Sequence, residues 1–264
     1  NSLNLSMTLI SGGGFLPTES ISKIISTNFQ KVILIFSLLV SLLNIYLLFN
    51  IFNKNTLIKE HREDLYLIIL SIIFCSFIYF NNYNGLDIII SVLSSLANSG
   101  LTLMESQNNL SLYFLLITII GGSIFSNTSG IKLTRFYILL KITSLEIIKL
   151  ISPNSIINKT IFGSDKKILD DHVKISFLIF ISFFLSLFIL SSLLVVDNIG
   201  FEKSFKLSIL TLTNTVNSEM FNMQNLNFAN LLTSSKISLI LFMIIGKIEL
   251  ISIFLIFKKI LFKD

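Results

Sequence analysis

Charge is scarce in this sequence: only 13% of its 264 residues are Asp, Glu, Lys or Arg, whereas 53% are hydrophobic. A soluble domain carries about 25% charged residues, so too few polar segments exist here to coat a soluble core. The composition indicates an integral membrane protein. Residues 32–52 and 173–196 each pass the roughly 20-residue test for spanning a bilayer. The shorter run 65–80 spans it with help from flanking residues or a thinned bilayer.

Residue types that support chemistry are also rare. Cys75 is the single cysteine, so no disulfide forms within the chain. The two histidines, His61 and His172, lie in separate charged segments without neighbours at metal-ligand spacing, and we expect both to be solvated. The glycines at 12–14 lack the preceding strand and the following Lys and Ser/Thr of a phosphate loop. We therefore expect no enzyme, no cofactor and no metal other than a transported ion.

The cations are unevenly distributed, and the net charge is +5. They gather in residues 54–62, 141–167 and 258–263, whereas the connections 81–84, 104–109 and 219–233 contain none. The positive-inside rule places the basic segments in the cytoplasm. Beside membrane spans, these cations suit anionic lipids of the bilayer or a cytosolic partner, and we expect no nucleic acid.

One unit occurs twice: a long apolar run, a half-length apolar helix, a loop of small residues and a second long run. The first copy comprises 65–80, 86–97, the loop 98–102 and 110 onward, and the second comprises 173–196, 201–212, the loop 213–218 and 234–257. The chain opens in the tail of a third copy, with 3–10, the loop 11–15 and 32–52. The predicted organisation is 1–60 (end of one pore-loop unit), 61–150 (a unit with a broken second helix), 151–172 (a cytoplasmic connection) and 173–264 (a last unit).

The half-length helices favour an ion filter. A helix of 12 residues is about 18 Å long and ends near the middle of a bilayer. Its C-terminus carries about half a negative charge, which attracts a cation, and rings of backbone carbonyls replace the hydration shell of K⁺. The alternative is a re-entrant loop that only closes a helix bundle. The filter candidates are Gly12, Gly13, Gly14, Asn98, Ser99, Gly100, Thr215, Val216 and Asn217.

Residues 110–141 are too long for one simple span and are interrupted by small and polar residues at 121–130. We interpret the interruption as a gate under the filter, because such residues survive at membrane depth beside water or protein. The alternative is a kink for close helix packing. The gate candidates are Gly121, Gly122, Ser123, Ser126, Asn127, Ser129 and Gly130.

Four ionisable residues are predicted at membrane depth: Lys132, Arg135, Lys247 and Glu249. Such residues usually face the interior of a bundle. In one interpretation Lys247 sets an electrostatic barrier below the filter and Glu249 balances Lys132 or Arg135. In the other, the charges form a structural ion pair between two helices.

Four motifs, in order, resemble the Trk-type potassium uptake proteins of the Trk/Ktr/HKT superfamily. Ser11-Gly12-Gly13-Gly14-Phe15 is similar to their second pore loop, and Asn98-Ser99-Gly100-Leu101-Thr102 to the third. The glycines Gly121-Gly122, with Ser129-Gly130-Ile131-Lys132 and Arg135, resemble the broken helix that follows. Gly246-Lys247-Ile248-Glu249 resembles the Gly-Arg-x-Glu signature of the last membrane helix. The resemblance covers essentially the whole chain.

The resemblance implies an all-α integral membrane fold with four helix–pore loop–helix units around a central ion pathway. One glycine per unit lines the filter, which by position gives Gly14, Gly100 and the site of Asn217. We expect the chain to be the C-terminal portion of a longer protein whose first unit lies upstream. Asn217 replaces the usual glycine and Lys247 the usual arginine, so selectivity for K⁺ over Na⁺ stays open.

The resemblance also implies K⁺ transport across the bacterial cytoplasmic (inner) membrane by a multi-pass homodimer with a cytosolic nucleotide-binding regulatory subunit. Such a subunit would contact the basic segments 141–167 and 258–263. Two other functions stay open. One is a secondary solute transporter with broken helices around a midplane site. The other is a membrane sensor or scaffold module that does not transport.

Overall fold

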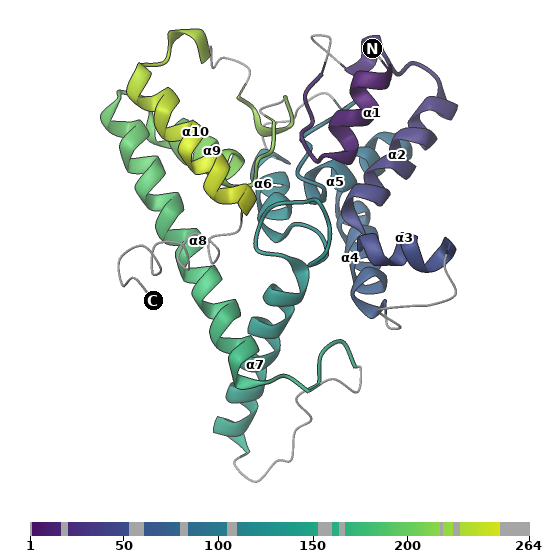
Figure 1. Ribbon diagram of the computed structural model, residues 1–264, viewed down its shortest axis with the longest axis vertical. Helices are drawn as coiled ribbons and strands as arrows, with labels where there is room; N and C mark the ends of the chain where they lie inside the picture. Colours follow the sequence, from purple (N-terminus) through teal and green to yellow (C-terminus); the bar gives the residue numbers. More distant parts are fainter. Residues whose placement is uncertain are drawn as a thin grey trace.

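A computed structural model describes residues 2–16, 21–52, 61–79, 84–104, 110–152, 160–163, 167–216, 219–223 and 228–248 (Figure 1). The secondary-structure elements in these ranges are helices joined by loops, with one isolated β-bridge between Thr160 and Lys167. The predicted all-α class is confirmed for this part of the chain. The α-helices are α1 (Ser2–Ile10), α2 (Asn28–Leu42), α3 (Ile45–Phe52), α4 (Arg62–Tyr79), α5 (Gly85–Leu96), α6 (Ser111–Ile120), α7 (Leu133–Ile151), α8 (Asp170–Val196), α9 (Phe201–Leu212) and α10 (Thr233–Ile248).

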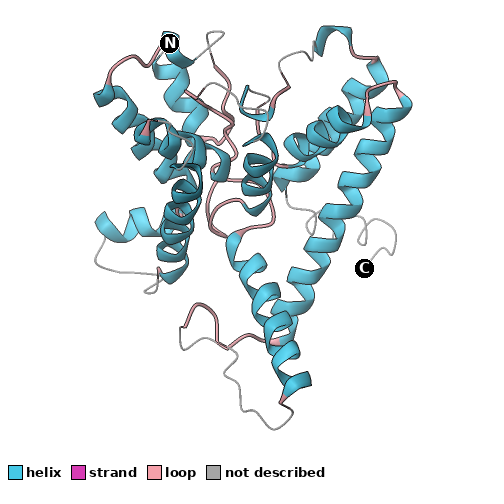
Figure 2. Cartoon of the chain, turned by 180° about the vertical axis from the view of Figure 1, so that it is seen from behind, coloured by secondary structure: helices cyan, strands magenta, loops and turns pink. Residues whose placement is uncertain are grey.

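The short helices α5 and α9 have 12 residues each and lie between longer neighbours. Helix α5 packs against α2, α4 and α6, α9 packs against α8 and α10, and α1 packs against α2. At the start of α5, the buried Asp87 carboxylate accepts a hydrogen bond from the Lys31 ammonium of α2 at 2.6 Å. The loops that connect these helices gather along the middle of the molecule (Figure 2).

The long apolar stretch 110–141 is interrupted, with α6 ending at Ile120 and α7 beginning at Leu133. From this interruption α7 runs away from the centre to meet α8 (Figure 1). The residues between Ile120 and Leu133 form a folded loop, which we call the gate loop after its predicted role.

The prediction of one continuous span over residues 32–52 is wrong. Helix α2 ends at Leu42 and α3 begins at Ile45. The side-chain oxygen of Asn44 accepts a hydrogen bond from the backbone N–H of Tyr46 at 2.9 Å. This local bond competes with the helical pattern, as asparagine side chains commonly do. The second apolar run of this unit is therefore a broken helix.

Apolar side chains cover much of the outer surface. Helix α8 has a mean hydropathy of 2.7 over its most apolar window and, of the helices in the described ranges, is the one long and apolar enough to cross a membrane. It exposes Phe177, Leu185 and Phe188, and α4 exposes Ile72 and Phe77. Large exposed apolar faces are typical of surfaces that contact lipid or another protein. The further membrane crossings stay predictions.

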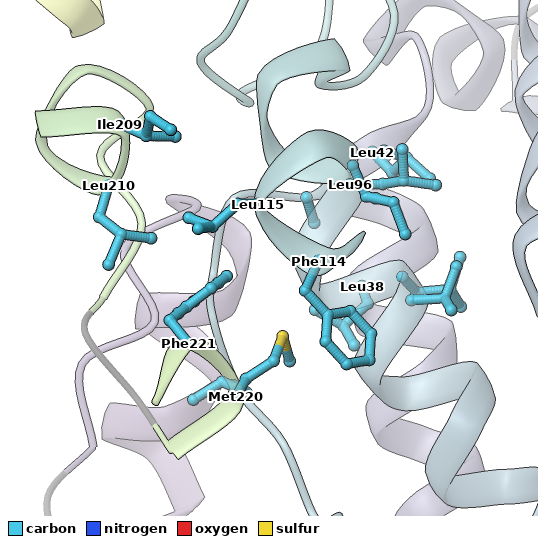
Figure 3. Close-up of a cluster of buried hydrophobic side chains, with 14 of the residues drawn as sticks. Leu38, Leu42, Leu96, Phe114, Leu115, Ile209, Leu210, Met220 and Phe221 are labelled. Carbon is cyan, nitrogen blue, oxygen red and sulfur yellow. The ribbon is translucent and has the colours of Figure 1, made fainter. Parts of the chain in front are cut away.

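A shared apolar core fixes the short helices relative to one another (Figure 3). It joins side chains of α2, α5, α6 and α9 to those of a short turn at Glu219–Phe221. Phe221 of this turn is fully buried, and the Ser95 hydroxyl of α5 donates to the Met220 sulfur at 3.1 Å. The labelled members are Leu38, Leu42, Leu96, Phe114, Leu115, Ile209, Leu210, Met220 and Phe221. Because the core clamps α5 and α9 together, the ends of these helices hold a defined relative position.

Part of the connection 151–172 is packed against the helices. The Phe162 ring is buried, with its centre 4.2 Å from that of Tyr137 on α7 and 4.8 Å from that of Tyr66 on α4. The Arg62 guanidinium donates a hydrogen bond to the carbonyl of Gly163. Residues 160–163 therefore join α4 to α7.

We expect Phe162→Ala to lower the free energy of unfolding by about 3 kcal/mol, because truncating a buried aromatic ring removes its contacts and leaves a cavity. Phe177→Ala removes the same ring from the exposed face of α8 and is the matched control. Thermal unfolding of the purified protein in one detergent measures both. Equal losses in the two variants would show that the Phe162 contacts add no stability.

Candidate functional site

The three helices that precede the predicted filter loops end in the same hydrogen-bonded turn, which α8 also adopts at Asp197–Ile199. In each turn one N–H bonds to the carbonyl four residues back, and the N–H two positions later bonds to the carbonyl five residues back. The bonds are Ser11 to Met7 (3.1 Å) and Gly13 to Thr8 (2.8 Å), Ala97 to Leu93 (2.8 Å) and Ser99 to Ser94 (3.0 Å), and Thr213 to Ile209 (2.9 Å) and Thr215 to Leu210 (2.9 Å). The three chains therefore leave their helices with the same local geometry.

The residue in the middle of each turn has a left-handed backbone. Its φ is +67° at Gly12, +57° at Asn98 and +52° at Asn214. Glycine and asparagine are the residues that most readily adopt this conformation at a helix end. The shared turn explains why these two residue types, and no β-branched residue, occupy this position.

The first two loops are in direct backbone contact. A Cβ atom on Gly14 (φ +65°) would overlap the carbonyl oxygen of Ser99. Ser99 is fully buried, and Gly12 lies close to the gate loop, since a Cβ atom there would be 3.3 Å from the Asn127 carbonyl oxygen. Only a residue without a side chain fits at position 14.

The second loop in turn contacts the third. A Cβ atom on Gly100 (φ +72°) would lie 2.5 Å from the Val216 carbonyl oxygen and 2.9 Å from Cγ2 of Thr215. The Asn98 amide donates to the Thr118 carbonyl at 2.8 Å and to the Thr215 hydroxyl at 3.5 Å. Gly14, Gly100 and Val216 therefore belong to three loops that meet one after another, with the negative ends of α1, α5 and α9 directed to the same region.

The residue of the third loop that is equivalent to Gly14 and Gly100 can be identified by position or by contact. Counted from the helix end, Val216 corresponds to Gly14 and Gly100. Counted by contact, Gly14 meets Ser99, whereas Gly100 meets both Thr215, the equivalent of Ser99, and Val216. Asn217 lies outside the described residues, and its filter position stays a prediction.

The gate loop is closed at its base by main-chain hydrogen bonds. The N–H groups of Ile131 and Lys132 donate to the carbonyls of Ile119 and Ile120, each at 3.0 Å. Gly121 (φ +69°) approaches the backbone of Ser129 so closely that a Cβ atom would overlap its carbonyl oxygen. The paired glycine-containing ends make this loop a compact body between α6 and α7.

The gate loop is folded around the buried Lys132 ammonium. This ammonium donates to the Ser126 carbonyl at 3.2 Å, to the Thr128 hydroxyl at 3.2 Å, and to the Thr128 carbonyl. Ser126 and Thr128 also share a hydroxyl–hydroxyl bond of 2.7 Å. The predicted pairing of Lys132 with Glu249 is not tested, because Glu249 lies outside the described residues.

Lys247 of α10 joins the gate loop to the end of α1. Its ammonium donates to the Asn127 carbonyl at 2.8 Å and to the Ser11 carbonyl at 3.2 Å. The Asn127 amide donates to the Ile10 carbonyl at 3.0 Å. Lys247 therefore places a positive charge on carbonyl groups where the first filter loop and the gate loop meet.

The neighbouring Gly246 allows α10 to approach the end of α9. A Cβ atom on Gly246 would overlap the Leu212 carbonyl oxygen. Asn214 lies two residues after Leu212, and its side-chain amide donates a hydrogen bond to the Met243 carbonyl of α10 at 3.0 Å. Gly246 thus lets α10 contact the end of α9, and the adjacent Lys247 directs its ammonium to the carbonyls of Ser11 and Asn127.

A cavity of about 230 Å³ lies between the gate loop and helices α7, α8 and α10. Residues of the loop, α7, α8 and α10 surround it, and it brings together three of the four predicted intramembrane charges: Lys132, Arg135 and Lys247. A second cavity, of about 470 Å³ and mostly apolar, lies between Phe15, the third loop and helices α9 and α10.

The sequence analysis did not identify the carboxylates of α4 that bind the gate loop and the break between α2 and α3. The Glu63 carboxylate of α4 accepts the Ile124 N–H at 3.0 Å, and Asp64 accepts the Asn44 N–H at 2.9 Å. His61, expected to be solvated, lies 3.4 Å from the Asp64 carboxylate and 2.7 Å from the Asn50 amide. The signal in the sequence was the pair of acidic residues beside a histidine at the start of an apolar run.

Among the described residues no group of three His, Cys, Asp or Glu side chains is placed to hold a metal ion.

Comparison with known proteins gives a fold match. No protein-family model matches the chain, and no curated protein matches it by sequence. One of the solved structures that match is the crystal structure of the potassium transporter TrkH from Vibrio parahaemolyticus, with a TM-score of 0.83 and 18% sequence identity.

The alignment covers 94% of this chain and 56% of the TrkH chain. The chain therefore spans just over half the length of that transporter. At 18% identity the similarity establishes the fold alone.

We expect Gly14→Ala to disrupt the loop contact, because the overlapping Ser99 atom is main chain and an alanine at this φ adds about 1–2 kcal/mol of strain. Gly13→Ala is the matched control, since a Cβ atom there meets its nearest neighbour, the Ser11 hydroxyl, at an ordinary 3.4 Å. Yield of folded protein and thermal unfolding compare the two. A Gly14→Ala protein as stable as Gly13→Ala would contradict the close contact.

Proposed function

We propose that this chain is part of a membrane protein of the Trk type that conducts K⁺ across the bacterial cytoplasmic membrane. The observation that carries the proposal is the meeting of three small-residue loops, each leaving the C-terminus of a helix by the same turn. Helix C-termini carry partial negative charge, and main-chain carbonyls replace the water around a K⁺ ion. The shared fold with a potassium transporter supports the same function.

In this proposal the filter consists of main-chain carbonyls of residues 12–14, 98–100 and 215–217. A fourth loop, implied by the family resemblance, completes the ring in the apolar cavity between Phe15 and Val216. Residues 1–60, 61–150 and 173–264 are the units around the pathway. Transport is passive through this filter and is driven by the membrane potential.

Below the filter, the gate loop controls passage. Its residue Asn127 lies against Gly12 and is held by Lys247. A cation that leaves the filter on this side meets the Lys247 ammonium and then the cavity lined by Lys132 and Arg135. We propose that the loop and these charges close the pathway until the loop rearranges.

The proposed assembly is a homodimer in the bilayer with a cytosolic nucleotide-binding regulatory subunit. The exposed apolar faces of α4 and α8 provide surfaces for lipid or for a second copy. The basic segments 141–167 and 258–263 are the proposed contacts for the regulatory subunit. Residues 160–163 of the first segment pack against α7, which begins at the gate loop.

Rubidium uptake by bacterial cells that lack their own potassium uptake systems tests the function. We expect cells carrying the full-length gene to take up rubidium faster than cells carrying an empty vector, and K⁺ in excess to suppress this uptake. Competition by Na⁺ measures selectivity. Uptake of an amino acid or a sugar instead would favour a secondary solute transporter, and a properly inserted protein without any uptake would indicate a sensor or scaffold module.

Lys247→Gln tests the barrier below the filter. We expect a several-fold rise in rubidium flux with little change in thermal unfolding, because the amide is neutral and still donates to a carbonyl. Lys174→Gln is the matched control, because Lys174 is exposed in the first turns of α8, where its ammonium lies 3.8 Å from the Asp171 carboxylate. A loss of stability without a change in flux would assign Lys247 a structural role.

A further inference from the structure

The gate loop has two halves with different supports. Residues 123–125 are hydrogen-bonded to α2, α3 and α4, whereas residues 126–130, together with Ile124, line the cavity beside Lys132 and Lys247. The first half is bound by main chain and carboxylate, and lysine ammonium groups bind the second half. The inference concerns the first half.

The break between α2 and α3 supplies part of the support. Ending a helix at Leu42 leaves carbonyl and N–H groups that need partners inside an apolar protein. The Leu42 carbonyl accepts the Ser123 N–H at 3.2 Å, and the Ile45 N–H donates to the Phe125 carbonyl at 3.1 Å. The break and the gate loop therefore satisfy each other's main-chain groups.

The first turn of α4 supplies the rest. The Glu63 carboxylate accepts the N–H of Ile124, the residue between the two bonded to the break. The next residue, Asp64, accepts the Asn44 N–H and so fixes the break itself. The adjacent Glu63 and Asp64 carboxylates thus bind the gate loop and the break that contacts it. The Tyr46 ring also meets the Phe125 ring edge-on, with ring centres 5.4 Å apart.

A carboxylate suits this position better than a neutral acceptor for a physical reason. A hydrogen bond to an ionised oxygen is about twice as strong as one between neutral groups. Burying the charge is unfavourable, and burial raises the pKa of the Glu63 carboxyl. The hydrogen bond from the Ile124 N–H and the Lys132 charge act in the opposite direction and favour the ionised form.

We propose that Glu63 is a positioning residue that fixes residues 123–125 of the gate loop to the break between α2 and α3, so that opening is confined to residues 126–130. This inference rests on the proposed gating function. With one end of the loop fixed, a movement of Lys247 or α7 changes the second half without detaching the loop. The loop then returns to the same closed position after each opening.

Three variants of Glu63 in the full-length protein test the anchor. Glu63→Ala removes the acceptor, Glu63→Gln keeps an oxygen at the same reach, and Glu63→Asp keeps the charge but shortens the side chain by one methylene. Glu146→Ala is the matched control, because Glu146 is exposed on α7 and pairs with Lys149. If Glu63→Ala does not fold, Glu63→Asp takes its place.

Hydrogen–deuterium exchange of peptides that cover residues 121–130 is the first readout. We expect exchange at 123–125 to be about tenfold faster in Glu63→Ala, intermediate between this variant and wild type in Glu63→Gln, and unchanged in Glu146→Ala. Rubidium flux through reconstituted protein is the second readout. We expect Glu63→Ala to leak several-fold more than wild type at unchanged thermal unfolding, and Glu63→Gln to leak less than Glu63→Ala.

Each result decides the inference. Unchanged exchange at 123–125 in Glu63→Ala would overturn the anchor, whatever the flux. Faster exchange with wild-type flux would overturn its role in gating. A wild-type protein that folds but carries no rubidium would instead refute the proposed function, and the exchange data would still report whether Glu63 holds the loop.

Discussion

The structure depends on one constraint: main-chain polar groups inside an apolar body need partners. Helices meet this need internally, so each place where a helix stops demands a local solution. The ends of α1, α5 and α9 share one turn, and the break after Leu42 pairs with the gate loop. Under the proposed function, a dehydrated cation is a further partner for the carbonyl groups of the three loops. Ion selectivity would then have the same physical origin as structural integrity.

Two lysines meet the same need on the other side of the loops. The ammonium groups of Lys132 and Lys247 bind carbonyls of the gate loop, and Lys247 also binds the carbonyl of Ser11 at the end of α1. A permeating cation is attracted by carbonyl groups of the same kind, so a tethered ammonium competes with it. Lysine has a compact charge on a flexible stem, whereas arginine binds through a rigid planar fork. The lysine at position 247 is therefore easier to displace from its carbonyls.

The sequence predicted the elements whose signals are local. The half-length helices were expected at 86–97 and 201–212 and lie at Gly85–Leu96 and Phe201–Leu212, and small residues marked the interruption before α7. It did not predict the break at Asn44, because its partners, Asp64 and Phe125, lie 20 and about 80 residues away along the chain. An isolated asparagine in an apolar run gives no sign of such partners. The supporting role of Glu63 was missed for the same reason.

The chemistry of the site explains how a fold can persist at low sequence identity. Main chain approaches main chain where the loops meet, so side chains are constrained only where a Cβ atom has no room, as at Gly14, Gly100 and Gly246. Elsewhere the backbone conformation matters more than the residue, and Gly12, Asn98 and Asn214 share one left-handed geometry. A site in which main chain contacts main chain therefore constrains the residue type at few positions of the sequence.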